Sequence, residues 1–341
     1  MNRRLFLMGV AGAAGCSPAR RGPRLNVFNW SNYVAEETIP RFERESGVHV
    51  RYGVFESNEE MLARVLSGNS GWDVVFPSHY YIQPMIENGL LLPLEHGSLP
   101  HLNALEPRFR NAPWDPTLQY CVPYMWGASG ILYSPKLSPA PKAWADLWDD
   151  RLRGRLTMLD DPAEVLGACL KKLGHSLNAT EEPVLRQAQA EAIRQKPLIQ
   201  AYLNAEVRDQ MVAGDVLASQ LWATTAQQAI DEAEQLRFVY PSEGFAVYAD
   251  CAVILRESRR IELAHRFIDY LLRPEVAAEI VKESRTATAN GAALQLLPPE
   301  ISHLPALYPD AETLSRGEWF ATMPAEAQRL RDRIWTEIKS A

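Results

Sequence analysis

Carboxylate side chains stand beside apolar runs at two places in this chain. Asp161 and Glu164 lie in the segment LDDPAE, and Asp250 ends the segment VYAD. Carboxylates so placed can form the acid and base pair of a hydrolase. They can also bind a cation, because an ammonium group that leaves water needs a charged or strongly hydrogen-bonding partner. In isolation Asp161 and Glu164 fit a helix start better, since acids flanking Pro162 are typical of a first turn.

Aromatic side chains follow other apolar segments in the same way. The alternating pattern of LNVFNWSNY (25–33) leads into a loop that begins near Trp30, and VVFPSHYY (74–81) and LWATTA (221–226) repeat the arrangement. In open α/β sheets ligands bind just beyond the carboxyl ends of the strands. Aromatic faces attract cations and shield methylene groups from water. These segments therefore predict the walls of a binding cleft.

The first third of the chain alternates strand and helix patterns. Strand-like runs at 25–28, 48–54 and 73–76 are separated by helical stretches, which predicts a parallel sheet with crossover helices. Ser57 and Glu60 have the spacing of a capping box, in which the hydroxyl and the carboxylate satisfy reciprocal backbone donors before an amphipathic helix.

A second block of helix and strand patterns begins after the proline-rich SPAPK, at residues 142–148, and indicates a domain crossing. A buried strand is expected at 252–255. A strongly periodic helix is expected at 267–280, interrupted at Pro274, and an amphipathic helix at 324–339.

The N-terminus reads as an export signal. Residues 1–15 combine a basic head, a short apolar run and small residues, which is typical of a signal peptide and too short to span a bilayer. The element AAGC resembles a lipobox, so Cys16 is expected to carry lipid, with 16–23 as a linker. Arg3 and Arg4 resemble the start of a twin-arginine signal.

Composition limits the remaining function classes. The chain has 341 residues and a formal charge of −7, which argues against nucleic acid as a partner and allows two domains. Besides Cys16, the cysteines are Cys121, Cys169 and Cys251, without zinc-type spacing. Three buried thiols are favoured over a single disulfide.

Motifs for catalysis are absent from the sequence. It contains no HExxH, no GxSxG and no glycine-rich phosphate loop, and its histidines lack metal-ligand spacing. We therefore expect a protein that is not an enzyme and that needs neither a cofactor nor a metal. A carboxylate-pair hydrolase built on Asp160, Asp161 and Glu164 is the alternative from another class.

Taken in order, these segments resemble the periplasmic polyamine-binding proteins, the spermidine/putrescine receptors of ABC importers. The resemblance covers nearly the whole chain after the signal. It implies a two-lobed α/β fold with a hinge and an interlobe ligand cleft. Lobe 1 would comprise 24–127 and 249–294, and lobe 2 would comprise 128–248 and 295–341. It also implies a monomer that delivers polyamines to a permease and ATPase complex from outside the cytoplasm.

The resemblance carries ten ligand-binding positions onto this sequence: Trp30, Ser31, Tyr33, Ser78, Tyr80, Asp161, Glu164, Trp222, Tyr248 and Asp250. Three positions depart from the spermidine-selective pattern, namely Asn32 in place of an acid, the region of Thr286 in place of a tyrosine, and that of Phe320 in place of a glutamine. The choice between spermidine and putrescine stays open. Ferric ion, suggested by Tyr80 and Tyr81, another organic cation and an amino-acid derivative are alternative ligands of the same fold.

Overall fold

The computed structural model describes residues 22–341, so the predicted signal peptide, the predicted lipidation site Cys16 and most of the predicted 16–23 linker lie outside the described part. The strands are β1 (Arg24–Trp30), β2 (His49–Phe55), β3 (Val74–Val75), β4 (Cys121–Tyr133), β5 (Leu156–Met158), β6 (Ile199–Tyr202), β7 (Ala218–Trp222), β8 (Arg237–Val239), β9 (Phe245–Ile254), β10 (Ala287–Thr288) and β11 (Gly317–Trp319).

The α-helices are α1 (Thr38–Ser46), α2 (Asn58–Leu66), α3 (Ile82–Glu87), α4 (Pro107–Arg110), α5 (Pro162–Lys172), α6 (Glu182–Gln195), α7 (Val207–Ala213), α8 (Ala223–Glu232), α9 (Ile261–Leu271), α10 (Pro274–Ser284), α11 (Gly291–Leu294), α12 (Pro299–Ser302), α13 (Ala311–Leu314) and α14 (Ala325–Ser340). The 3-10 helices are η1 (His79–Tyr81), η2 (His96–Ser98), η3 (Pro100–Ala104), η4 (Trp144–Trp148), η5 (Asp150–Leu152) and η6 (Lys196–Leu198). Within residues 22–341, no helix combines the length and apolar character needed to cross a membrane.

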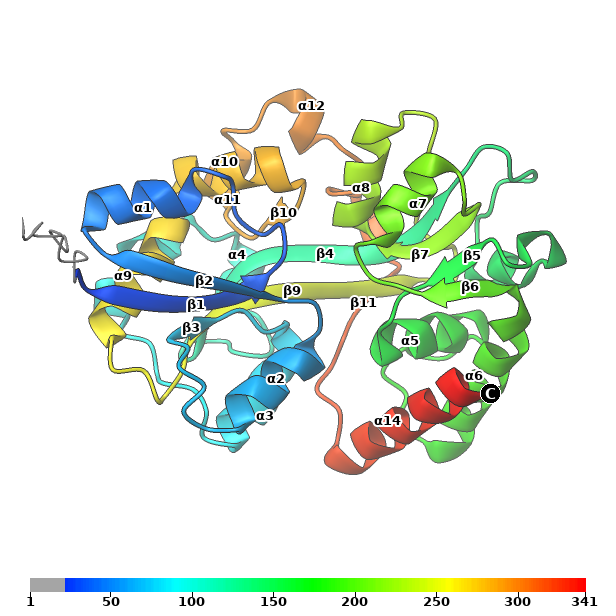
Figure 1. Ribbon diagram of the computed structural model, residues 1–341, viewed down its shortest axis with the longest axis horizontal. Coiled ribbons are helices and arrows are strands. Elements are labelled where there is room, and N and C mark those ends of the chain that lie inside the picture. The colour runs from blue at the N-terminus through cyan, green and yellow to red at the C-terminus, as the bar shows by residue number, and fades with distance from the viewer. Residues whose placement is uncertain (1–21) are drawn as a thin grey trace, which may run out of the picture.

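One mixed sheet runs through the molecule in the order β2-β1-β3-β9-β4-β7-β5-β6, with β10 and β8 paired to β4 and β11 paired to β9. The two ends of the sheet are parallel, β2-β1-β3 on one side and β7-β5-β6 on the other. The antiparallel strands β4 and β9 join them and extend across the middle of the molecule (Figure 1). Two α/β units thus share a pair of long central strands.

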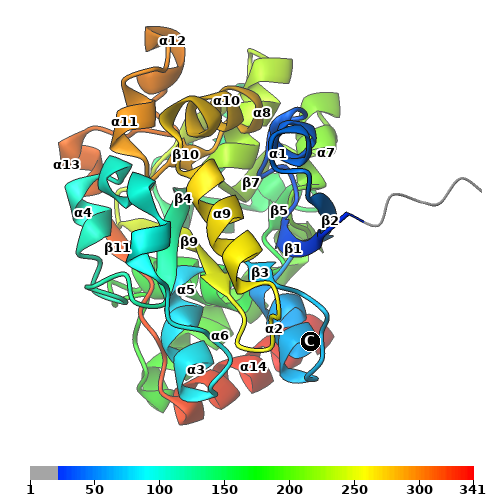
Figure 2. The same cartoon turned by 90° about the vertical axis from the view of Figure 1, so that its left-hand side faces the viewer.

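Helices cover both faces of this sheet in each half. On one side of β4 and β9, α1 and α10 lie above the sheet and α2 and α3 below it, and on the other side α7 and α8 lie above and α5, α6 and α14 below (Figure 1). The view at 90° shows the same separation into layers (Figure 2). Every residue of β9 is buried, as expected for a strand whose two faces are both covered. The predicted α/β class is confirmed.

The predicted lobe borders at 127/128 and 248/249 fall inside β4 and β9. Chain segments on either side of these positions therefore continue the same strands. The third border, 294/295, follows α11, and the chain beyond it returns to the centre through β11, which pairs with β9. The division into lobes stays a prediction.

The start of α2 and the interruption at Pro274 were both predicted from local sequence patterns, and the structure contains both. Ser57 is the N-cap of α2 and accepts a hydrogen bond from the Glu60 backbone N–H at 3.1 Å. The Glu60 carboxylate, however, accepts from the Glu56 backbone N–H, one residue earlier than a capping box requires. The helix predicted at 267–280 is two helices, and Pro274 begins the second, because proline suits a first turn but breaks an interior.

Candidate ligand-binding site

One cavity brings all ten predicted ligand-binding residues together. The empty space between its walls is about 640 Å³, including the part open to solvent, which suits a small organic ligand. Its lining consists of Trp30, Ser31, Asn32, Tyr33, Glu56, Asn58, Ser78, Tyr80, Asp161, Glu164, Ala205, Trp222, Thr224, Thr225, Gln228, Tyr248, Asp250 and Phe320.

Asp250 lies within the central strand β9 rather than beyond a strand end, and its side chain is 1% exposed. The Ser78 hydroxyl donates to Oδ1 at 2.6 Å and the Tyr33 hydroxyl donates to Oδ2 at 2.8 Å. Burial raises the pKa of Asp250 to about 7, although the two hydroxyl donors act in the opposite direction. The carboxyl is therefore oriented by hydroxyl donors, and no basic side chain in the described part of the chain forms an ion pair with it.

Asp161 and Glu164 lie at the N-terminus of α5, as their spacing with Pro162 predicts. Asp161 is the N-cap and accepts from the backbone N–H groups of Ala163 and Glu164 at 2.8 and 3.0 Å. The Glu164 carboxylate accepts from Trp222 Nε1 at 3.2 Å. Burial raises the pKa of both acids, and the charge of Asp161 raises that of Glu164 further. Asp161 and Glu164 therefore start a helix and also line the cavity, because this helix begins at the cavity wall.

Aromatic rings form much of the remaining wall. Trp30, the last residue of β1, is fixed by a hydrogen bond from its Nε1 to the Phe76 carbonyl at 2.8 Å. Tyr80 and Phe320 pack against each other with ring centroids 5.1 Å apart. Tyr248 lies over Gly127 of β4, where a Cβ atom would lie 2.6 Å from the tyrosine hydroxyl oxygen. Glycine at 127 is therefore required for the position of the Tyr248 ring.

The charges of the cavity have one sign. Four carboxylates line it, those of Glu56, Asp161, Glu164 and Asp250, and no lysine, arginine or histidine is among the lining residues. Within residues 22–341 none of these four acids forms an ion pair with a basic side chain, whereas other acids of the chain do. Buried carboxylates are costly when they have no counter-charge. The cavity is suited to a ligand that carries positive charge.

Several lining residues were not predicted as ligand contacts. They are Glu56, Asn58, Ala205, Thr224, Thr225 and Gln228. Glu56 directly follows β2, so the strand-end rule applied to the other segments would have found it. Thr224 and Thr225 belong to the segment LWATTA, from which only Trp222 was selected.

Of the three positions that depart from the spermidine-selective pattern, two line the cavity and one does not. Asn32 and Phe320 line the cavity, whereas Thr286 is fully buried outside the lining. Tyr81 also lies outside it and donates to Glu59 at 2.6 Å. A ferric site that uses both Tyr80 and Tyr81 does not fit this arrangement, and no cluster of three or more His, Cys, Asp or Glu in the described chain could hold a metal ion.

The three cysteines among residues 22–341 are buried. Cys121, Cys169 and Cys251 are free thiols in the structure, as the interpretation of small core residues expected. They do not contribute to the cavity.

The chain matches a known protein family and is similar to proteins that bind polyamines. The family model described as bacterial extracellular solute-binding protein matches residues 37–309. A putrescine/cadaverine-binding protein of Pseudomonas aeruginosa is 32% identical over 99% of both chains. The spermidine/putrescine-binding periplasmic protein of Escherichia coli is 33% identical over 93% of this chain and 91% of the relative.

Among solved structures, a putative spermidine/putrescine ABC transporter from Listeria monocytogenes superimposes with a TM-score of 0.90 at 32% identity, covering 93% of this chain and 99% of that one. This overlap confirms the fold predicted from the resemblance.

Proposed function

This chain belongs to the bacterial extracellular solute-binding protein family, and we propose that it is an extracytoplasmic receptor that binds spermidine and/or putrescine between two lobes and delivers them to the permease and ATPase of an ABC importer. The observation that carries the proposal is the cavity itself, which has four carboxylates, no basic residue among its lining and walls of aromatic rings. The polyamine-binding names of its similar relatives support the same ligand class.

Each group of side chains has a distinct role in this proposal. The carboxylates of Asp161, Glu164 and Asp250 pair with ammonium groups, which lose their hydration inside the cavity. The rings of Trp30, Tyr80, Trp222 and Tyr248 cover the methylene spacers and present their faces to the cationic ends. Ser31, Tyr33 and Ser78 act as hydroxyl partners, the last two by orienting Asp250.

Binding without turnover is part of the proposal. The acids of the cavity accept hydrogen bonds from hydroxyl, indole and backbone donors, which orient them for binding. A different organic cation remains the second candidate, favoured by the same negative lining. A carboxylate-pair hydrolase would instead convert a substrate that the purified protein holds.

Calorimetric titration of the purified protein with putrescine, spermidine and a neutral diamide of similar length tests the function. We expect both amines to bind with one-to-one stoichiometry and the diamide not to bind. The three acids meet two or three ammonium groups, so we expect spermidine to be preferred by about 1–2 kcal/mol, the scale of a charge-assisted hydrogen bond. Binding of the diamide with equal affinity, or chemical conversion of a bound amine, would exclude this function.

The proposal also includes export and anchoring. Residues 1–15 serve as the signal peptide, with Arg3 and Arg4 suited to the twin-arginine route, and Cys16 carries lipid that holds a monomeric receptor at the outer face of a membrane. Several acyl chains anchor a protein stably, whereas one chain does so only marginally.

Replacement of the lipidated residue tests this anchor. We expect Cys16→Ser to give either an unprocessed precursor or a protein released into the soluble fraction, as measured by fractionation and intact mass. Normal processing and membrane retention of the variant would show that another element provides the anchor.

A further inference from the structure

The cavity wall formed by α8 differs chemically from the acidic walls. The helix begins at Ala223, and its first turn and next residues place Thr224, Thr225 and Gln228 on the cavity. Its N-cap is Trp222, which makes no side-chain hydrogen bond to the helix, and its first turn contains no acid. The backbone N–H groups of a first turn have no partner within their own helix, and the helix dipole makes this end positive.

A buried hydroxyl lies at the same place. The Thr224 side chain is 7% exposed, and its Oγ1 has no hydrogen-bond partner among residues 22–341. A buried hydroxyl without a partner costs free energy, and this one belongs to a residue that lines the cavity. It can donate its proton to an oxygen atom of a ligand.

An amide acceptor stands one helical turn further along. Gln228 Nε2 donates to the Ser284 carbonyl at 2.6 Å, which leaves Gln228 Oε1 free to accept a hydrogen bond. This wall therefore offers donors from the helix start and Thr224 and an acceptor from Gln228. A secondary amide needs both kinds of partner, since its carbonyl accepts and its N–H donates.

An ammonium group is poorly suited to this wall, because the positive end of a helix disfavours a cation. A carboxylate on the ligand is also disfavoured, because four carboxylates already line the cavity. A neutral hydrogen-bond acceptor carries no net charge, so neither the helix dipole nor the four carboxylates disfavour it at this wall. We infer that the receptor also binds mono-N-acylated polyamines, with the acyl amide at the start of α8 beside Thr224 and the remaining ammonium at the acidic walls.

This inference rests on the proposed polyamine-binding function and adds a second ligand class to the same cavity. The probes are putrescine and N-acetylputrescine, titrated calorimetrically into the full-length mature protein. We expect the acetylated diamine to bind within about thirtyfold of putrescine. If putrescine binds and N-acetylputrescine is weaker by more than that factor, the inference fails while the proposed function stands. If neither putrescine nor spermidine binds, the proposed function itself fails.

Two threonine-to-valine substitutions test whether the Thr224 hydroxyl contacts the acyl amide of the ligand. Thr224→Val removes the hydroxyl and keeps the shape, so the affinity for N-acetylputrescine should fall at least about fivefold, as expected for the loss of one hydrogen bond, and by a larger factor than the affinity for putrescine. Thr286→Val is the matched control, because Thr286 Oγ1 is also buried without a partner but does not line the cavity. It should change neither affinity. Equal weakening of both ligands by Thr224→Val, or no effect on either, would overturn the assignment.

Discussion

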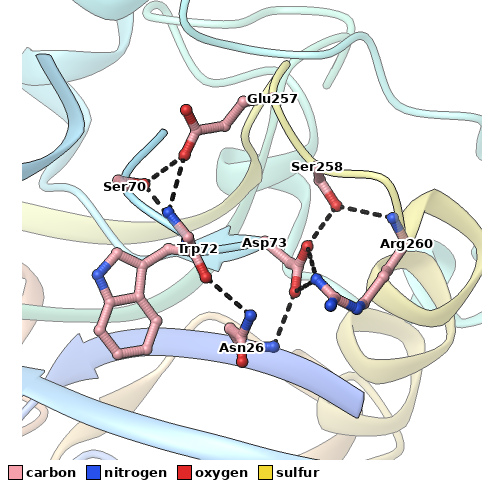
Figure 3. A network of polar contacts seen from close by, with 8 residues as sticks. Asn26, Ser70, Trp72, Asp73, Glu257, Ser258 and Arg260 are labelled. Carbon is pink, nitrogen blue, oxygen red and sulfur yellow. Dashed lines mark hydrogen bonds and ion pairs between the residues drawn. The ribbon is translucent and has the colours of Figure 1, made fainter. Parts of the chain in front are cut away.

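Two buried aspartates of this protein, Asp73 and Asp250, have contrasting surroundings. Asp73 is 2% exposed and Asp250 is 1% exposed. Asp73 accepts from the Asn26 backbone N–H at 2.8 Å and the Ser258 hydroxyl at 2.7 Å, and Arg260 Nη1 lies 3.3 Å from both of its oxygens (Figure 3). Asp250 accepts only from two hydroxyl groups, and no basic side chain of the described residues pairs with it.

The difference separates a structural acid from an acid suited to a ligand. The Asp73 network ties β1 to the turn before α9 and includes its own cation, so its charge is balanced within the fold. At Asp250 the hydroxyl donors set the orientation of the carboxyl group, and no basic side chain among residues 22–341 forms an ion pair with it, which suits an acid that pairs with a cationic ligand. Substitution at the two positions should therefore affect different properties, stability at Asp73 and affinity at Asp250.

The largest expected effect is on ligand affinity. Asp250→Asn should weaken putrescine and spermidine binding by about 2–5 kcal/mol, the range for removing one partner of a desolvated charge pair. The fold should tolerate the change, because a hydroxyl can donate to an amide oxygen and can accept from an amide NH₂. Calorimetry measures the affinity and thermal unfolding measures the stability. Unchanged affinity in a folded variant would move the ligand away from Asp250.

The matched substitution at Asp73 should lower stability instead. In Asp73→Asn the amide NH₂ would face a donor, either the Asn26 N–H or Arg260, and charge-assisted hydrogen bonds would be lost. Because Arg260 is 40% exposed and stays hydrated, we expect a loss of about 2–3 kcal/mol in the free energy of unfolding, measured by urea titration. Polyamine affinity should remain within about twofold. A variant that unfolds normally but binds weakly would contradict the contrast between the two sites.

The contrast also shows what could be predicted from the sequence. Asp161 and Asp250 were selected because they stand beside apolar runs and at positions that the family resemblance carries over, and both line the cavity. The sequence could not predict the hydrogen-bond partners of these carboxylates. Asp250, for example, is oriented by Ser78 and Tyr33, which are 172 and 217 residues away in the chain. Long-range pairing of this kind depends on how the strands are ordered in the sheet, and local patterns do not contain that order.

The central strand β4 illustrates the same limit for the fold. Its sequence CVPYMWGASGILY contains proline and glycine, which usually interrupt strands, so no strand was predicted there. The pairing with β9 shifts register between Pro123 and Met125 and accommodates the proline. Gly127 is required by the Tyr248 ring across the strand pair. One residue that weakens the local strand prediction, Gly127, is thus needed to accommodate the ring of Tyr248, which lines the cavity.

The pH dependence should separate the ligand site from the rest of the protein. Burial raises the pKa of Asp250 to about 7, so in the unliganded folded protein this carboxyl keeps a proton at pH values where the unfolded chain, with a pKa of about 4, has lost it. The native state then binds more protons than the unfolded state, and this group lowers the free energy of unfolding as pH rises from about 4 to 7.

A cationic ligand reverses that trend, because it binds to the ionised carboxylate. We expect putrescine affinity to rise between pH 6 and pH 8, by up to about tenfold per pH unit for each carboxyl that must release a proton. Titrations in buffers of different ionisation enthalpy would measure the proton release directly. The same pH series on Asp250→Asn should show a shallower dependence. Affinity that is constant over this range would indicate that the acids are already ionised before the ligand binds.

The smallest expected effect is that of an aromatic wall. Trp222→Ala removes a ring that lines the cavity and donates to Glu164, so polyamine affinity should fall by about 1–2 kcal/mol through the loss of cation–π contact and methylene burial. Trp148→Ala is the control, because Trp148 already holds a cation of the protein, with Lys172 Nζ 4.8 Å from its ring, and lies outside the cavity. Like Asp73, Trp148 has its charged partner within the fold, so its loss should lower stability and leave affinity unchanged. If both tryptophan variants weaken binding equally, the effect is a general loosening of the fold, and Trp222 is not a ligand platform.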